Sequence, residues 1–303
     1  MTKPHAASWD DFWASNAAKD GGGCLPDGYK GIDAAQQAAW RNFAKALPKG
    51  ARLLDLATGD GRVMGWIMRA RRDIKPTGCD LAPKLPPPPR GAQIKTGVPM
   101  EQLPFPDGRF AALTSQFGFE YSEVAKAAAE AARVLRPGGT AGLLMHRGDG
   151  PILAHNLKRR EQIEWALQTN DLVGLAKRSL KSRALGIATI PSAIVEAPAI
   201  GQQDFGTGSA AWEIAEAVKQ TMILGARDNP ANVARLLDTI AAKAENELGR
   251  IASLEVACAT ADDTDALMAA LHSAGLEQIE ATELSDETYR APFATFRTLR
   301  RTG

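Results

Sequence analysis

The chain has 303 residues, 36 Lys and Arg against 35 Asp and Glu, 45% hydrophobic residues and three cysteines. This composition is typical of a globular protein with one large core or two smaller ones, so no metal or disulfide framework is needed for folding. The balanced charge argues against a nucleic-acid partner, and the cysteines are too far apart for a zinc site or a secreted disulfide pattern.

The first residues do not have the unbroken apolar core of a secretion signal, since His5, Asp10 and Asp11 interrupt them. The apolar runs of the chain are also too short to span a bilayer. We therefore expect a cytoplasmic protein with no membrane span and no bound metal.

The first half of the chain alternates helix and strand patterns. After an irregular arm over residues 1–32, apolar spacing predicts a helix over 33–47, which Pro48 and Gly50 end. Strands are expected over 52–57, 75–80, 93–96, 110–116 and 140–146, with helices after the first and over 123–135. Strands that alternate with helices predict a doubly wound parallel sheet covered on both faces.

The second half begins with helices that have no strands between them, over 151–250, which we interpret as a helical insertion. Within it, Pro and Gly punctuate residues 184–208 and predict a long loop, and a helix is expected to end at Leu248. A helix over 261–274 and an antiparallel pair of strands over 276–284 and 292–299 follow. The expected domains are thus the arm 1–32, an α/β domain of 33–150 and 251–303, and the insertion 151–250.

One strand-to-helix turn carries the strongest chemical signal. The segment LLDLATGDGRV, residues 53–63, places Gly59 and Gly61 on the turn and Asp55 near the strand end. Glycines allow a ligand close to the backbone, and the helix N-terminus favours an anionic group. Asp80 ends the next strand, where a carboxylate can accept the hydroxyls of a ribose. The GxGxxG spacing of a nicotinamide dehydrogenase is absent.

Three further segments occur in a recognisable order: EQLPFPDGRF at 101–110, SQFGFEY at 115–121 and RVLRPGG at 133–139. With the turn, they resemble the class I S-adenosylmethionine-dependent methyltransferases, in the group that includes the ubiquinone and menaquinone methyltransferases. The resemblance implies a Rossmann-like fold with an antiparallel C-terminal hairpin and a helical insertion after strand five. It also implies S-adenosylmethionine as methyl donor and S-adenosylhomocysteine as product.

The resemblance assigns site residues by position. Two positions depart from the family pattern: Ala57 replaces a usual glycine, a mild change if its φ is negative, and Pro99 replaces a common adenine-contacting Asp. The residues implied to bind the cofactor are Asp55, Ala57, Thr58, Gly59, Gly61, Asp80, Leu81, Met100, Glu101 and Gln116.

The catalytic candidates are His146, at the expected carboxyl end of strand five, and Tyr29. A proton acceptor is needed only for some acceptors of a methyl group, and His146 has a competing interpretation as a polar residue bonded to nearby backbone. Tyr29 has one as an anchor of the arm. Glu120 and Tyr121 are further pocket candidates, although Glu120 also fits a solvated surface position.

The function expected from these residues is methyl transfer to an O or N atom of a small-to-medium organic molecule. The alternative is a methyltransferase-like partner or regulatory subunit that has lost its chemistry, which Ala57 and Pro99 motivate. The insertion either caps the acceptor or forms a homodimer interface, and the sequence pattern does not choose between these two roles.

Overall fold

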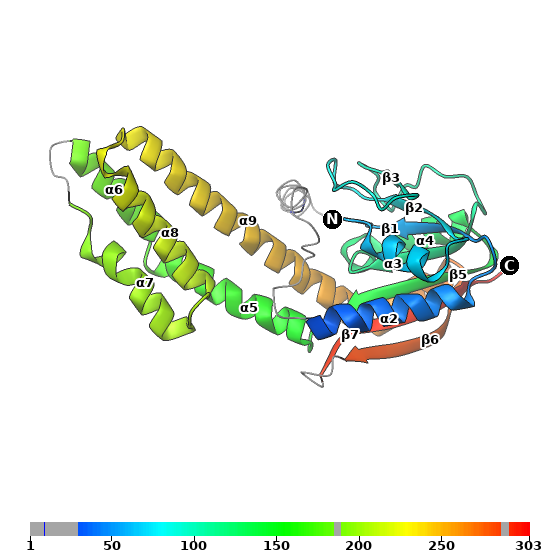
Figure 1. Ribbon diagram of the computed structural model, residues 1–303. Coiled ribbons are helices and arrows are strands. Elements are labelled where there is room, and N and C mark those ends of the chain that lie inside the picture. The colour runs from blue at the N-terminus through cyan, green and yellow to red at the C-terminus, as the bar shows by residue number, and fades with distance from the viewer. Residues whose placement is uncertain (1–8, 10–29, 185–188, 286–290) are drawn as a thin grey trace. The chain divides into compact units, whose positions relative to one another are not determined.

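The structure is a computed structural model, and it describes residues 9, 30–184, 189–285 and 291–303 (Figure 1). The chain divides into two compact units, the first of residues 1–154 and 252–303, the second of residues 155–251. Tyr29 lies outside the described residues.

The first unit is built on a seven-stranded sheet with the order β3-β2-β1-β4-β5-β7-β6 (Figure 1). Strands β1 to β5 pair with one another in parallel, and β7 is antiparallel to both β5 and β6. This confirms the predicted doubly wound sheet with an antiparallel C-terminal hairpin. The strands are β1 Arg52–Leu56, β2 Lys75–Cys79, β3 Gln93–Lys95, β4 Phe110–Gln116, β5 Leu135–His146, β6 Leu276–Ser285 and β7 Pro292–Arg301.

Helices cover both faces of this sheet. On one face lie α2 (Lys30–Ala46) and α3 (Arg62–Ala70), where Trp40 of α2 contacts Phe296 of β7 with ring centroids 4.9 Å apart. On the other lie α4 (Val124–Val134) and α10 (Thr264–Ser273), whose buried side chains join the core around Leu54 and Leu143. Buried, nearly continuous apolar strands such as β4 are expected between two helical layers.

The start of β5 and the end of α9 differ most from the sequence prediction, and the helix predicted over 261–274 begins only at Thr264 because α9 continues to Asp262. Strand β5 begins at Leu135 rather than Thr140, because Leu135 pairs with Phe110 before a bulge leads to the Ala112–Thr140 pair. Helix α9 (Pro230–Asp262) continues past the predicted end at Leu248 into the first unit. Gly249 follows the predicted end, but a glycine inside a helix costs only about 1 kcal/mol, and burial of Ile251 and Leu254 beyond it offsets this cost.

The second unit is helical throughout its described residues. It contains α6 (Leu172–Ala184), α7 (Ser192–Phe205), α8 (Ala210–Leu224), a short 3-10 helix (Gly225–Arg227), parts of α5 (Pro151–Glu164) and α9, and a π-helical turn (Trp165–Thr169). Its main core gathers side chains from these helices, among them Leu180, Ile194, Val218, Met222 and Leu237.

The predicted loop over 184–208 is wrong for residues 192–205, which form α7. Pro198 lies inside this helix and is buried, as is Gly201. A Cβ on Gly201 would lie 3.1 Å from the Trp212 backbone nitrogen, so this glycine allows α7 to approach α8 closely. Burial against α8 therefore outweighs the low helix propensity of Pro and Gly.

Candidate functional site

The candidate site lies at the carboxyl ends of β1, β2, β4 and β5. The strand order reverses between β1 and β4, because the chain continues from β1 outward to β2 and β3 and then returns to β4. Ligands of open α/β sheets bind at such a switch point. The loops after these strands contain most of the residues that the sequence analysis selected.

The turn after β1 has the backbone conformation that its glycines predict. Gly59 and Gly61 have φ values of 51° and 73°, and the Gly61 N–H donates to the Thr58 carbonyl at 2.8 Å. Gly61 also precedes α3. A Cβ on Gly61 would lie 2.7 Å from Cδ of Pro89, so the proline-rich loop closes on this turn.

Asp80 connects the end of β2 to that turn. Its Oδ2 accepts a hydrogen bond from the Gly59 N–H at 2.9 Å, and its Oδ1 accepts one from the Ala82 N–H, also at 2.9 Å. The residue is 9% exposed. A carboxylate oxygen can accept more than one hydrogen bond, so these contacts orient Asp80 and leave it acceptor capacity.

Asp55 lies beneath the turn. Its two oxygens accept hydrogen bonds from the hydroxyls of Thr58, at 2.6 Å, and Thr114, at 2.7 Å. Burial raises the pKa of Asp55 to about 7, and the two threonine donors oppose this shift only in part. Asp55 therefore holds Thr58 in place rather than facing an open cavity. The sequence did not indicate Thr114, because a threonine whose hydroxyl forms a hydrogen bond and one that only packs look alike in the pattern of a buried strand.

The replacement of the usual glycine by Ala57 is not a mild change, because the φ of Ala57 is positive, at +50°. Phe117, just after β4, is also in the left-handed region, at +53°. Such a conformation costs a residue with a Cβ about 1–2 kcal/mol, and strained residues cluster at functional sites. Gly118 lies directly against the Ala57 side chain, so a side chain at 118 would clash with it. The two strained residues flank the switch point.

The remaining cofactor candidates are spread around this edge. Gln116 accepts a hydrogen bond from Trp40 Nε1 at 2.6 Å and donates one to Gln36 at 3.1 Å. Glu101 accepts a hydrogen bond from the Glu123 N–H, before α4. Met100 packs partly buried against the sheet core, and Leu81 is 40% exposed.

His146 ends β5 and is surrounded by residues of the SQFGFEY segment. Glu120, in the 3-10 helix Phe119–Tyr121, accepts a hydrogen bond from the His146 backbone N–H at 2.9 Å and contacts Nδ1 at 2.8 Å. The ring centroid of Phe117 lies 4.1 Å from that of His146, and Tyr121 meets it edge-on at 5.9 Å. Glu120 is 2% exposed, so the solvated-surface interpretation is wrong.

Strand β4 carries a buried hydroxyl group near the switch point. Ser115 Oγ, in β4, is buried and makes no hydrogen bond to the described residues. It lies 3.2 Å from where a Cβ of Gly118 would be. Ser115 belongs to the SQFGFEY segment, but the sequence pattern gives no sign that its hydroxyl group is buried.

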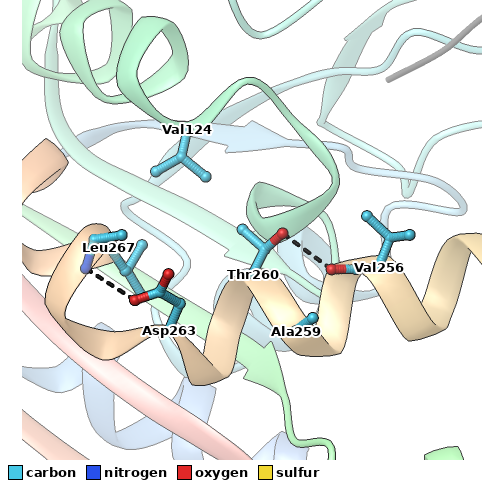
Figure 2. A pocket seen from close by; sticks show the side chains of 7 residues that line it. Val124, Val256, Ala259, Thr260, Asp263 and Leu267 are labelled. Atoms are coloured by element: carbon cyan, nitrogen blue, oxygen red, sulfur yellow. Dashed lines mark hydrogen bonds between the residues drawn. The ribbon is translucent and has the colours of Figure 1, made fainter.

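A separate cavity of about 420 Å³ lies between α4, the end of α9 and α10 (Figure 2). Its lining is Val124, Val256, Ala259, Thr260, Asp263, Ala266 and Leu267. The polar groups of Thr260 and Asp263 are used within the helices: the threonine hydroxyl bonds the Val256 carbonyl, and the aspartate caps α10 at Ala266. It includes none of the residues implied to bind the cofactor.

Within the described ranges, no group of three or more His, Cys, Asp or Glu residues is arranged to hold a metal ion. Among the helices that the structure describes, none has both the length and the apolar character needed to cross a membrane.

Comparison with known proteins identifies the domain. Residues 54–143 match the family model described as methyltransferase domain. Demethylmenaquinone methyltransferase of Thermus thermophilus is 37% identical over 113 residues, which are 33% of this chain and half the length of that relative. Residues 54–143 therefore form a methyltransferase domain, in agreement with the resemblance that the four segments show.

Solved structures similar to the whole chain are more distant. A methyltransferase in complex with the Trm112 activator of Haloferax volcanii is 13% identical, with 100% of this chain and 99% of that one covered and a TM-score of 0.46. The 1,6-didemethyltoxoflavin-N1-methyltransferase of Burkholderia thailandensis is 13% identical, with 100% and 92% covered and a TM-score of 0.45. At these scores the likeness says nothing about acceptor or partner.

Proposed function

We propose that this protein transfers a methyl group from S-adenosylmethionine to an oxygen or nitrogen atom of a small-to-medium organic acceptor. One observation supports this most strongly. Within the segment that matches the methyltransferase domain, Asp80 at the end of β2 holds the Gly59 amide of the turn after β1. A glycine turn and a strand-end carboxylate are thus joined at the switch point of the sheet, where nucleotide-like ligands bind in such folds.

The residues at this edge fit S-adenosylmethionine. The turn before α3 offers backbone N–H groups at a helix N-terminus, which suit a carboxylate. Asp80, oriented by two backbone donors, has acceptor capacity for ribose hydroxyls. Ser115 Oγ is a buried polar atom without a described partner beside the same loops. When bound, S-adenosylmethionine supplies an electrophilic methyl group on a positively charged sulfur.

Each remaining candidate has a part in the proposal. Ala57, Thr58, Gly59 and Gly61 hold the methionyl portion, and Asp55 positions Thr58. Asp80 and Leu81 contact the ribose. Met100 and Glu101 border the adenine, where Pro99 offers no N–H, and Gln116 closes over the methionyl end.

The acceptor side of the proposal is centred on His146, with Tyr29 as a second candidate outside the described residues. The helical insertion, 151–250, serves as an acceptor cap or as a homodimer interface. Light scattering distinguishes the two roles. A molar mass of one chain would exclude the homodimer interface and favour the acceptor cap, and a molar mass of two chains would favour the interface.

We also propose a cytoplasmic location. Cys79 and Cys258 are free and buried thiols. Burial raises the pKa of both, that of Cys258 to about 12, so neither is a reactive thiolate at neutral pH. Buried unpaired cysteines are compatible with a reducing compartment.

The deciding experiment is calorimetric titration of the full chain with S-adenosylmethionine and, separately, with S-adenosylhomocysteine. We expect both to bind with dissociation constants in the micromolar range, and a screen of small hydroxyl and amine compounds would then identify the acceptor. A chain that is folded by circular dichroism and binds neither compound would favour the non-catalytic partner protein instead.

A further inference from the structure

Glu120 and His146 form a buried pair at the edge of the proposed site. The backbone N–H of His146 and its Nδ1 both face one carboxylate oxygen, Oε1 of Glu120, at 2.9 and 2.8 Å. Glu120 is 2% exposed and His146 8%, so water has little access to either. The Glu120 carboxylate therefore fixes the imidazole ring through its Nδ1 side.

This arrangement decides which ring nitrogen carries the proton. The backbone N–H donates to Oε1, and a carboxylate oxygen accepts hydrogen bonds without donating one, so Nδ1 is the donor in the second contact. The neutral imidazole is then protonated at Nδ1 and keeps its lone pair on Nε2. Within the described residues, the hydrogen bonding of the ring runs through Nδ1.

The second oxygen of Glu120 points to the same role. Oε2 is buried without a hydrogen-bond partner in the described part of the chain. A buried carboxylate with so little compensation is costly, and a positive charge nearby offsets that cost. A protonated His146 ring would be that charge, with Nδ1 already 2.8 Å from the carboxylate.

The ring is also enclosed by aromatic side chains. The Phe117 ring lies against it, tilted by 35° at a centroid distance of 4.1 Å, from a backbone with φ of +53°, and Tyr121 meets it edge-on. Strain of this kind persists only where the surrounding structure enforces it. The strained Phe117 therefore adds a second, independent indication that the position of His146 matters.

We infer that Glu120 is a positioning residue that holds His146 with Nε2 ready to take the proton of a hydroxyl group on the methyl acceptor. This inference rests on the proposed function and narrows it from oxygen or nitrogen to a hydroxyl compound. A neutral amine already has a nucleophilic lone pair and attacks before it loses a proton. A hydroxyl is a weak nucleophile and gains from a base during the attack.

The step balances. A lone pair of the acceptor oxygen forms the new O–CH₃ bond, and the S–CH₃ bond breaks with its electron pair remaining on sulfur, which leaves S-adenosylhomocysteine. The hydroxyl proton moves to Nε2 of His146. The imidazolium and the Glu120 carboxylate then form an ion pair, and the proton is later released to water.

The protonated nitrogen can be observed directly by NMR without knowledge of the acceptor. The chain has four histidines, so a full-length sample labelled with ¹⁵N at histidine gives few ring signals, and His146→Gln assigns those of His146. We expect His146 to be protonated at Nδ1. Glu120→Gln should keep this form, because its carbonyl oxygen still has to accept the backbone N–H. Glu120→Ala should shift the population toward the Nε2–H form.

Addition of S-adenosylhomocysteine to the same sample tests proximity to the methyl donor. We expect the ring signals of His146 to move. The ring signals of His272 should not move. This exposed residue lies in the last turn of α10, close to Leu276, which pairs with the end of β7 far from the Ala294 partner of His146. Calorimetry on the same sample reports whether the compound binds.

The outcomes separate the inference from the proposed function. A wild-type His146 protonated at Nε2, or His146 signals unchanged by bound S-adenosylhomocysteine, would overturn the inference and leave the methyl-transfer proposal standing. Absence of binding by calorimetry would overturn the proposed function and the inference with it. The wild-type spectrum decides the protonation state even if Glu120→Ala does not fold.

Discussion

Asp80 accepts the Gly59 N–H across 21 residues of sequence, at 2.9 Å, and so fixes the end of β2 against the turn after β1. The same carboxylate caps its own loop through Ala82. This double engagement gives Asp80 one orientation before any ligand is present. Preorganised groups bind more tightly because less freedom is lost on binding.

Asp80→Ala should weaken binding of S-adenosylhomocysteine by about 1–3 kcal/mol, roughly 5- to 150-fold in Kd, through loss of ribose hydrogen bonds and of the Gly59 contact. Calorimetric titration measures this, with circular dichroism to show that the variant is folded. Asp204→Ala, an exposed position on α7, should bind like the wild type. An unchanged affinity of Asp80→Ala would show that Asp80 does not contact the ligand.

Asp55 should make the stability of the protein depend on pH. Its pKa is raised to about 7 in the folded state and is near 3.9 in an unfolded chain, so between these values only the folded state keeps the proton. The free energy of unfolding should therefore fall as pH rises from about 4 to about 7, and level off above that.

Asp55→Asn should remove this component, which amounts to a few kcal/mol over that range. Urea unfolding of the wild type and the variant at about pH 4.5, 6 and 8 provides the comparison. The wild type should lose more stability than the variant as pH rises. Parallel curves for the two proteins would contradict the buried, partly protonated Asp55.

Ala57→Gly should leave stability unchanged or raise it by up to about 1 kcal/mol. Relief of the left-handed strain at φ of +50° is offset in part by the greater freedom of glycine in the unfolded chain. Ala57→Val should cost about 2 kcal/mol or more, because a β-branched side chain is worse in this conformation and Gly118 leaves it no room.

The matched control for Ala57 is Ala129, which is exposed on α4. Ala129→Gly should destabilise by about 1 kcal/mol, the usual penalty of glycine inside a helix. Urea midpoints of the three variants measure these effects. If Ala57→Gly is as harmful as Ala129→Gly, the strain at Ala57 is absent in solution.

Arg133 should be needed to hold the EQLPFPDGRF segment against α4. Its guanidinium donates to the carbonyls of Leu103 at 2.9 Å and Phe105 at 2.8 Å, and it pairs with Asp107 and Glu130. Lysine cannot reproduce this fork of donors, so Arg133→Lys should destabilise the protein by about 1–2 kcal/mol.

Thermal unfolding and the rate of proteolysis within 101–109 both report on Arg133. Lys126→Ala, which removes an exposed pair with Glu123, is the control and should leave the melting temperature unchanged. Equal behaviour of the two variants would mean that Arg133 does not secure the segment.

Local pattern was enough to predict most of the elements of the sheet. The short, continuous apolar runs around Leu54 and Leu113 predict buried strands, and the structure places them as expected, together with the antiparallel pair from Leu276 onward. The prediction failed at α7, where Pro198 and Gly201 indicate a loop. Contact with α8, which no local pattern reveals, decides that segment.

The chain order and residue types alone therefore determined the fold class, the methyltransferase segments and the presence of carboxylates at strand ends. The tertiary structure decided what those groups do. Asp55 meets Thr114 across 59 residues and Glu120 meets His146 across 26, and the φ of Ala57 depends on how two loops pack. Hydrogen bonds between distant residues form only once the strand order has placed them side by side, so their burial, strain and protonation follow from packing.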